Sequence, residues 1–220
     1  ALSLVGSEMC IRDSLWLVKE TNCRYHVNHI STKETVEIIR KAKKLGLPVT
    51  CDTSPPYFTL NELSLEDYRT FSKLNPPLRS EEDRLSIIEG ICDGTVDAIS
   101  SDHTPQDQDA KRLPFNQAEF GGVGLETLLS LSLNLVKNKY ISVEKLLRLL
   151  TVNPAKILNL DYGMINEQSE ADISVFDLSK SWKINPESFF GKSKNSPFDG
   201  LLVEGKNIMT FVRGRLVYRL

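Results

Sequence analysis

The sequence contains few of the residues from which metal sites and disulfide frameworks are usually built. Its only histidines are His26, His29 and His103. Its four cysteines are Cys10, Cys23, Cys51 and Cys92, and none of them forms a CxxC pair. The cysteine spacing argues against a zinc ribbon and against a disulfide framework, and it favours a reducing, cytoplasmic location. Any metal site built from this chain must therefore use very few imidazoles.

Long apolar runs and a strong charge of either sign are also lacking. No run of about 18 apolar residues occurs, so we expect no membrane-spanning helix. The net charge is −2, which gives no electrostatic reason to expect nucleic acid or an anionic membrane as a partner. With 40% hydrophobic and 25% charged residues, the 220-residue chain has the composition of an ordinary globular protein with one large or two modest domains.

The first residues, "ALSLVGSEMCIRDS", have a short apolar start but no basic region before it and no cleavage site after it. They therefore make a poor signal peptide. We interpret residues 1–12 as a non-native leader, similar to a translated adapter or assembly scar, and exclude them from fold reasoning. On this interpretation the natural protein is longer and its N-terminal part is missing.

Residues 13–160 alternate between segments typical of strands and helices. Strand-like runs are "CRYHVNHI", "PVTCDTS" and "VDAISSDH". Between them lie two helical segments, one opened by a capping box of Ser31 and Glu34 and one capped by Ser80. Three further helices follow. This order predicts βαβ units and a parallel sheet, and three strands amount to part of a (β/α)₈ barrel, which needs eight.

Residues 161–220 have a different pattern. "ADISVFDL" alternates apolar and polar residues, and "NIMTFVRGRLVY" reads as two strands about an Arg-Gly turn. We predict a small β module packed on the helical layer.

Polar side chains stand at the ends of the predicted strands, where α/β enzymes keep their sites. His29 ends the first strand and Asp102 ends the third, while Asn75 follows in the "KLNPPL" loop. Because side chains alternate along a strand, His29 and His26 point to opposite faces. We expect His29 to belong to a site and His26 to be packed, with its ring nitrogens bonded by backbone. Turn chemistry before Pro105 is the simpler alternative for Asp102.

Seven blocks add a family resemblance that covers the chain from Arg12 to Leu220. They are "YHVNHISTKETVEIIRKAKKLGLPVT", "KLNPPLRSEEDR", "DGTVDAISSDHTPQD", "FGGVGLETLL", "NPAKIL", "ADISVFD" and "KSKNSPFDG". Their order resembles that of dihydroorotases, in particular the long type found in multifunctional complexes, within the amidohydrolase superfamily.

The resemblance implies a metal-dependent (β/α)₈ barrel with a small β-sandwich, of which this chain is the C-terminal part. It implies zinc-dependent interconversion of dihydroorotate and N-carbamoyl-aspartate in pyrimidine synthesis, with two zinc ions in a complete site. By position, His29 matches a zinc ligand, and Asp102 matches the residue that is both a metal ligand and the catalytic base. This pairing suits amide hydrolysis because zinc lowers the pKa of bound water to about 7 and a carboxylate can accept its proton.

The substrate positions implied by the resemblance are Asn75, the backbone at Phe120 and Gly121, and the position of Gln106. The family has a histidine where this chain has Gln106, which can donate a hydrogen bond but carries no charge. A "TPHH" block is replaced by "SPPY", a change that we expect to alter the loop and not the metal site. The following segment, Gln106–Arg112, is either a mobile lid or a plain surface loop.

The family's HxH pair, its bridging acidic residue or modified lysine, and another histidine ligand are not found in this sequence. We therefore expect the 220-residue chain alone to be catalytically inert and poorly folded, because an incomplete barrel leaves sheet edges unpaired. The parent protein is expected to be an active, homo-oligomeric enzyme that binds neither nucleic acid nor membrane. Two alternatives stay open: a non-catalytic subunit that scaffolds aspartate transcarbamoylase, and a related hydantoinase or allantoinase.

Overall fold

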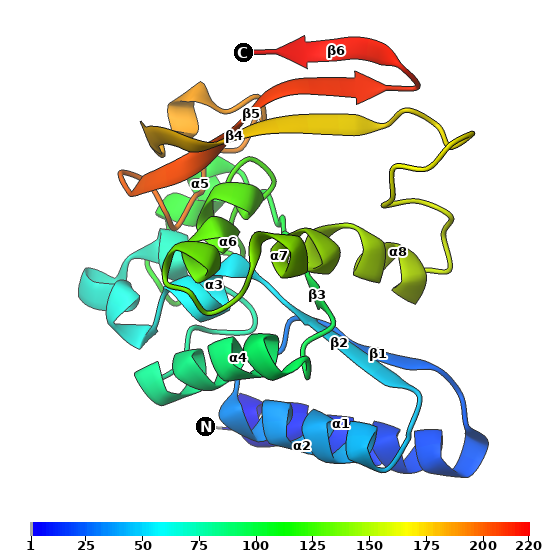
Figure 1. The fold of residues 1–220 in the computed structure, drawn as a ribbon. Coiled ribbons are helices and arrows are strands. Elements are labelled where there is room, and N and C mark those ends of the chain that lie inside the picture. Colours follow the sequence, from blue (N-terminus) through cyan, green and yellow to red (C-terminus); the bar gives the residue numbers. More distant parts are fainter. Residues whose placement is uncertain (1) are drawn as a thin grey trace.

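The computed structural model describes the backbone of residues 2–220 and the side chains of residues 8–220. Two sheets lie at different levels of the molecule, with helices between and beside them (Figure 1). Helix α1 (Leu2–Thr21) and the antiparallel C-terminal sheet lie at opposite ends. No helix in this described part of the chain has the length and apolarity needed to cross a membrane.

The first sheet has three parallel strands in the order β1 (Tyr25–Val27), β2 (Val49–Thr53) and β3 (Ala98–Ile99). All three coincide with the runs predicted from the sequence, and the parallel pairing is confirmed. They are short, so each soon reaches the polar residues that follow it. That these are the last three strands of a barrel stays a prediction.

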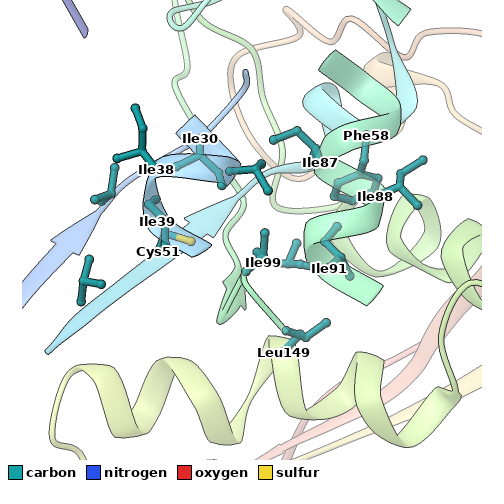
Figure 2. Close-up of a cluster of buried hydrophobic side chains, with 14 of the residues drawn as sticks. Ile30, Ile38, Ile39, Cys51, Phe58, Ile87, Ile88, Ile91, Ile99 and Leu149 are labelled. Carbon is teal, nitrogen blue, oxygen red and sulfur yellow. The ribbon is translucent and has the colours of Figure 1, made fainter. Parts of the chain in front are cut away.

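Helices pack against this sheet and form the main core. Helix α2 (Lys33–Lys44) follows β1, and α4 (Glu81–Asp93) precedes β3. Ser80 caps α4 as predicted, but the cap of α2 is Thr32 and not Ser31, since the Thr32 side chain accepts from the amide of Thr35. Figure 2 shows the aliphatic cluster that joins these helices to the strands, including Ile39, Cys51, Ile87, Ile91 and Ile99. Burial of these side chains fixes the direction of the strands and hence the place where their ends meet.

The remaining helical segments lie in the connections between the strands. They are α3 (Pro55–Thr59), η1 (Glu62–Tyr68), η2 (Thr70–Ser72), α5 (Gln108–Arg112), α6 (Leu128–Lys137), α7 (Val143–Leu150), α8 (Val152–Ile157) and η3 (Pro186–Ser188). Residues 106–112 are not a plain loop, because Gln108–Arg112 form helix α5, and whether this segment is a mobile lid stays a prediction.

The second sheet is antiparallel and contains β4 (Ile173–Lys183), β5 (Leu202–Val212) and β6 (Arg215–Arg219). The last two strands meet at an Arg213-Gly214 turn, as the sequence predicts. The sheet is attached to α6, where the Ser130 hydroxyl donates to the carbonyl of Gly205 at 2.6 Å. A β module packed on the helical layer is thus confirmed, whereas a β-sandwich is not seen in the described residues.

The predicted leader spans residues 1–12. Residue 1 and the side chains of residues 2–7 lie outside the described parts of the chain. The remainder of the leader belongs to α1, and Ile11 is buried in the main core with Leu15. Whether these residues are native stays a prediction.

Candidate metal and substrate site

The side chains of His29 and Asp102 face each other across the ends of two strands. Nε2 of His29 lies 3.6 Å from Oδ1 of Asp102, and the two side chains are 28% and 13% exposed. Both residues adopt a left-handed backbone, with φ of 53° and 47°. That conformation is unusual for residues other than glycine and is found repeatedly where structure serves function. The structure therefore brings together the two residues that the sequence placed in one metal site.

Asp52, at the end of β2 between these residues, fixes the orientation of the histidine. Its Oδ1 accepts from the backbone amide of His29 at 2.9 Å and lies 3.0 Å from Nδ1 of the same residue. The hydroxyl of Ser100 also donates to this oxygen, at 2.8 Å. Because a carboxylate holds Nδ1, the favoured tautomer carries its proton there and leaves the lone pair of Nε2 directed toward Asp102.

The hydrogen bonds around Asp52 also set the charges of the site. The hydrogen bond to Asp52 raises the pKa of His29 above its ordinary value and outweighs the opposing effect of burial. Burial acts to raise the pKa of Asp52, but hydrogen bonds from His26, His29 and Ser100 bring it well below its ordinary range. Burial raises the pKa of Asp102, against the opposing effects of His29 and Tyr57. Asp52 is consequently the firmly ionised carboxylate, and Asp102 is the more basic one.

Tyr57 contributes a second contact to Asp102. It belongs to α3, it is only 3% exposed, and its hydroxyl lies 3.2 Å from Oδ2 of Asp102 and 2.9 Å from the carbonyl of Pro76. The expectation that the "SPPY" replacement affects only a loop is therefore wrong. Tyr57 is the final residue of that block, and it contacts the candidate catalytic carboxylate because α3 places its phenol next to Asp102.

His26 needs a partial correction. Its two ring nitrogens are bonded as expected, but by side chains and not by backbone: Nδ1 lies 2.7 Å from the Thr50 hydroxyl and Nε2 lies 3.0 Å from Oδ2 of Asp52. Both histidines thus contact the same carboxylate, one at each oxygen. The prediction that they point to opposite faces is wrong, because β1 ends at Val27 and strand alternation does not extend to His29. His26 reaches Asp52 because β2 pairs with β1 in register, with His26 opposite Thr50.

The predicted substrate positions lie on loops around this pair. Asn75 is exposed and precedes Pro76, whose carbonyl contacts Tyr57. The side-chain amide of Gln106 donates to the carbonyl of Phe120 at 2.9 Å. Gly121 has φ of 116°, and a Cβ there would come within 2.5 Å of a side-chain carbon of Thr104. Gln106 is thus bonded to Phe120, and Gly121 follows Phe120 in the chain. We call these three residues the predicted substrate edge.

The chemistry of the donor set fits a metal only in part. A separation of 3.6 Å between Nε2 of His29 and Oδ1 of Asp102 is close to that of two ligands sharing one zinc ion at about 2.0–2.1 Å each. The carboxylate behind His29 is the usual support for a metal-binding imidazole. Within the described residues, however, no group of three or more His, Cys, Asp or Glu side chains is arranged to hold a metal ion. The described residues thus offer two candidate ligands, His29 and Asp102.

Comparisons with known proteins show the family of this chain. The model of the amidohydrolase family matches residues 7–217. The chain belongs to the amidohydrolase family. Its similar curated relatives include a dihydroorotase of Desulforapulum autotrophicum, 46% identical over 199 residues that make up 90% of this chain and 46% of the relative. A dihydroorotase of Anaplasma phagocytophilum is 47% identical over 213 residues, or 97% of this chain and 48% of the relative.

Solved structures show a similar mixed α/β fold. L-Hydantoinase from Arthrobacter aurescens superposes with a TM-score of 0.91 and 32% identity, over 96% of this chain and 48% of that one. An inactive dihydroorotase-like domain of a Chaetomium thermophilum CAD-like multifunctional protein shares the fold, with a TM-score of 0.70 and 23% identity over 94% of this chain and 54% of that one. The chain thus spans about half the length of the amidohydrolases it matches.

Sequence reasoning missed Asp52 and Tyr57. Asp52 carried a usable signal, because it lies near the carboxyl end of the "VTCDTS" run, as Asp102 lies just after the third strand. Tyr57 carried none, since its contact depends on how α3 turns after β2.

Proposed function

We propose that this chain is part of a zinc-dependent dihydroorotase, which interconverts dihydroorotate and N-carbamoyl-aspartate. The observation that carries the proposal is the His29–Asp102 pair, held by Asp52 at the ends of three parallel strands. The relatives named dihydroorotase, at 46% and 47% identity, support this substrate over that of the hydantoinase at 32%.

In this proposal, His29 and Asp102 are ligands of the metal, and Asp102 is also the general base. When bound, the metal would polarise the amide carbonyl and make the attacking water more acidic. Asp102 accepts the proton of that water and delivers it to the leaving nitrogen. Its raised pKa suits this role, because a base must be able to hold the proton between the two steps. Asp52 keeps the imidazole of His29 in the ligating tautomer.

The substrate is held by the surrounding loops. Asn75 and Gln106 offer amide groups, and the segment of Phe120 and Gly121 offers backbone groups. An amide at position 106 can bond a substrate carboxylate without supplying charge, so the positive charge for that group must come from elsewhere.

The finer features of the whole protein are part of the same proposal. They include a (β/α)₈ barrel completed by further strands, a β-sandwich completed by another segment, a second zinc ion, a homo-oligomeric state and cytoplasmic location. The long type of dihydroorotase and an association with aspartate transcarbamoylase rest on the order of the seven sequence blocks. The half-length match supports a polypeptide that supplies the missing ligands.

A hydantoinase is the second candidate, because the L-hydantoinase similarity has a TM-score of 0.91. The observations favour catalysis over a scaffold, since drift would not be expected to keep His29 in contact with both Asp52 and Asp102.

The test is to assay the complete natural polypeptide, loaded with zinc, against dihydroorotate, carbamoyl-aspartate, hydantoin and allantoin. We expect turnover of the first pair and its loss in Asp102→Asn. Asp97→Asn is the matched control, because Asp97 is a bonded carboxylate that contacts neither His29 nor Asp102. Preference for hydantoin would replace the proposed substrate, and inactivity with full zinc loading would support the scaffold. The 220-residue chain alone is expected to be inert.

A further inference from the structure

Two lysines are buried beside the predicted substrate edge, and the proposed reaction leaves both unexplained. Lys111, on α5, has 0% exposure and is among the largest fully buried side chains. Its ammonium group donates to the carbonyl of Glu119 at 2.8 Å and to that of Lys73 at 3.3 Å. Burial and the neighbouring Lys73 lower the pKa of Lys111 to about 8.

Lys73 follows η2 and is 9% exposed. Its ammonium group donates to the carbonyls of Phe115 at 2.7 Å and Ala118 at 2.6 Å. It also lies 3.5 Å from the carbonyl of Asn116 and 4.5 Å from the ring centroid of Phe120. Together the two ammonium groups donate hydrogen bonds to backbone carbonyls of the turn at residues 115–119.

That turn leads directly into the substrate edge. The next residues are Phe120 and Gly121, and the amide of Gly121 donates to the backbone carbonyl of Lys73 at 3.0 Å. Asn75 lies only two residues beyond Lys73. The segment of residues 73–75 thus carries Asn75 and also binds the backbone amide of Gly121.

Stability alone gives a poor account of this arrangement. Within the described residues, the hydrogen-bond partners of both ammonium groups are backbone carbonyls and not carboxylates. Burying two like charges side by side is costly, and well-packed apolar side chains of the same size are often no less stable. What the lysines supply and apolar residues do not is a set of directional bonds that fixes the path of residues 115–121.

We propose that Lys73 and Lys111 are positioning residues, which hold the turn at residues 115–119 against the segment of Lys73 and Asn75 so that the substrate edge is formed before substrate binds. The inference rests on the proposed function, because it takes Asn75, Phe120 and Gly121 as substrate contacts. A preformed edge increases affinity by sparing the cost of ordering a loop on binding.

The test compares Lys73→Met and Lys111→Met with Lys145→Met in the complete protein. Lys145 is the matched control, since its ammonium group also donates to a backbone carbonyl, that of Cys92 at 2.8 Å, but on α7. The first measurement is amide hydrogen exchange at residues 119–121. We expect about tenfold faster exchange in the two variants and no change there in the control.

The second measurement separates KM from kcat. Loss of a preformed edge should raise the KM for dihydroorotate about tenfold while kcat per folded molecule changes little. A purely structural role would lower the amount of active enzyme and leave KM as it is. Unchanged KM in both variants overturns the proposal even where exchange is faster, and unchanged exchange overturns it by itself. If the unaltered protein turns over no cyclic amide, the proposed function fails, while exchange still decides whether the lysines hold the turn.

Discussion

Replacement of Asp52 with asparagine tests whether this carboxylate sets the metal affinity of the site. Asp52 is 9% exposed, accepts from the amide of His29 at 2.9 Å and lies 3.0 Å from Nδ1 of its ring. Asparagine keeps the shape and one oxygen acceptor but removes the charge, so His29 stays oriented while its ring becomes a weaker ligand. Loss of such an outer partner costs about 10–100-fold in metal affinity, which is about 1.4–2.8 kcal/mol.

The assay is a zinc titration of the complete protein, in which binding is measured by calorimetry or by competition with a chelator. Asp97→Asn is again the control, because the carboxylate of Asp97 accepts from the amide of Cys51 at 2.8 Å and binds Lys43 at 2.6 Å, away from the histidines. We expect weaker zinc binding only in Asp52→Asn. Unchanged zinc affinity would refute the reasoning, and an equal loss in the control would assign the effect to general destabilisation.

Three further predictions concern the neighbouring structure. Tyr57→Phe removes the hydroxyl beneath the candidate base and should lower kcat about tenfold, with about 1 kcal/mol lost in unfolding free energy, measured by kinetics and by denaturation. Gly121→Ala should destabilise by about 2–3 kcal/mol, because its Cβ would lie 2.5 Å from another carbon and its φ is 116°. Gly46→Ala, with φ of 76° and nothing within 4 Å, should cost only about 1 kcal/mol in the same urea titration, and equal losses would contradict this account. The pKa of Lys111, lowered from 10.5 to about 8 by burial and by Lys73, means that the folded protein binds fewer protons than the unfolded chain between these values. Stability should therefore rise by about 1–3 kcal/mol from pH 8 to 10.5 relative to Lys111→Met, and a parallel pH profile in the variant would show that the lysine is not buried as described.

The parallel sheet could be predicted from the sequence because its signals are local. Each strand is a short apolar run that ends in polar residues, and the helices between them carry caps such as Ser80. The residue that caps α2 was assigned one position too early, since Ser31 and Thr32 both have the right chemistry and only the path of the chain selects Thr32. The helix over residues 108–112 was missed because its burial depends on Lys111, a residue type that is almost never fully buried.

The candidate site could also be predicted only in part, because some of its residues have local sequence signals and others depend on long-range contacts. His29 and Asp102 were predictable because each lies a few residues after a strand, and parallel strands end at one edge of a sheet. The groups that give the pair its chemistry come from other elements and carry no spacing code: Asp52 binds the imidazole from the neighbouring strand, and Tyr57 reaches the carboxylate from a five-residue helix. Orientation of the imidazole and basicity of the carboxylate are thus properties of packing. A sequence can therefore name the ligands of such a site well before it can say how strongly they bind.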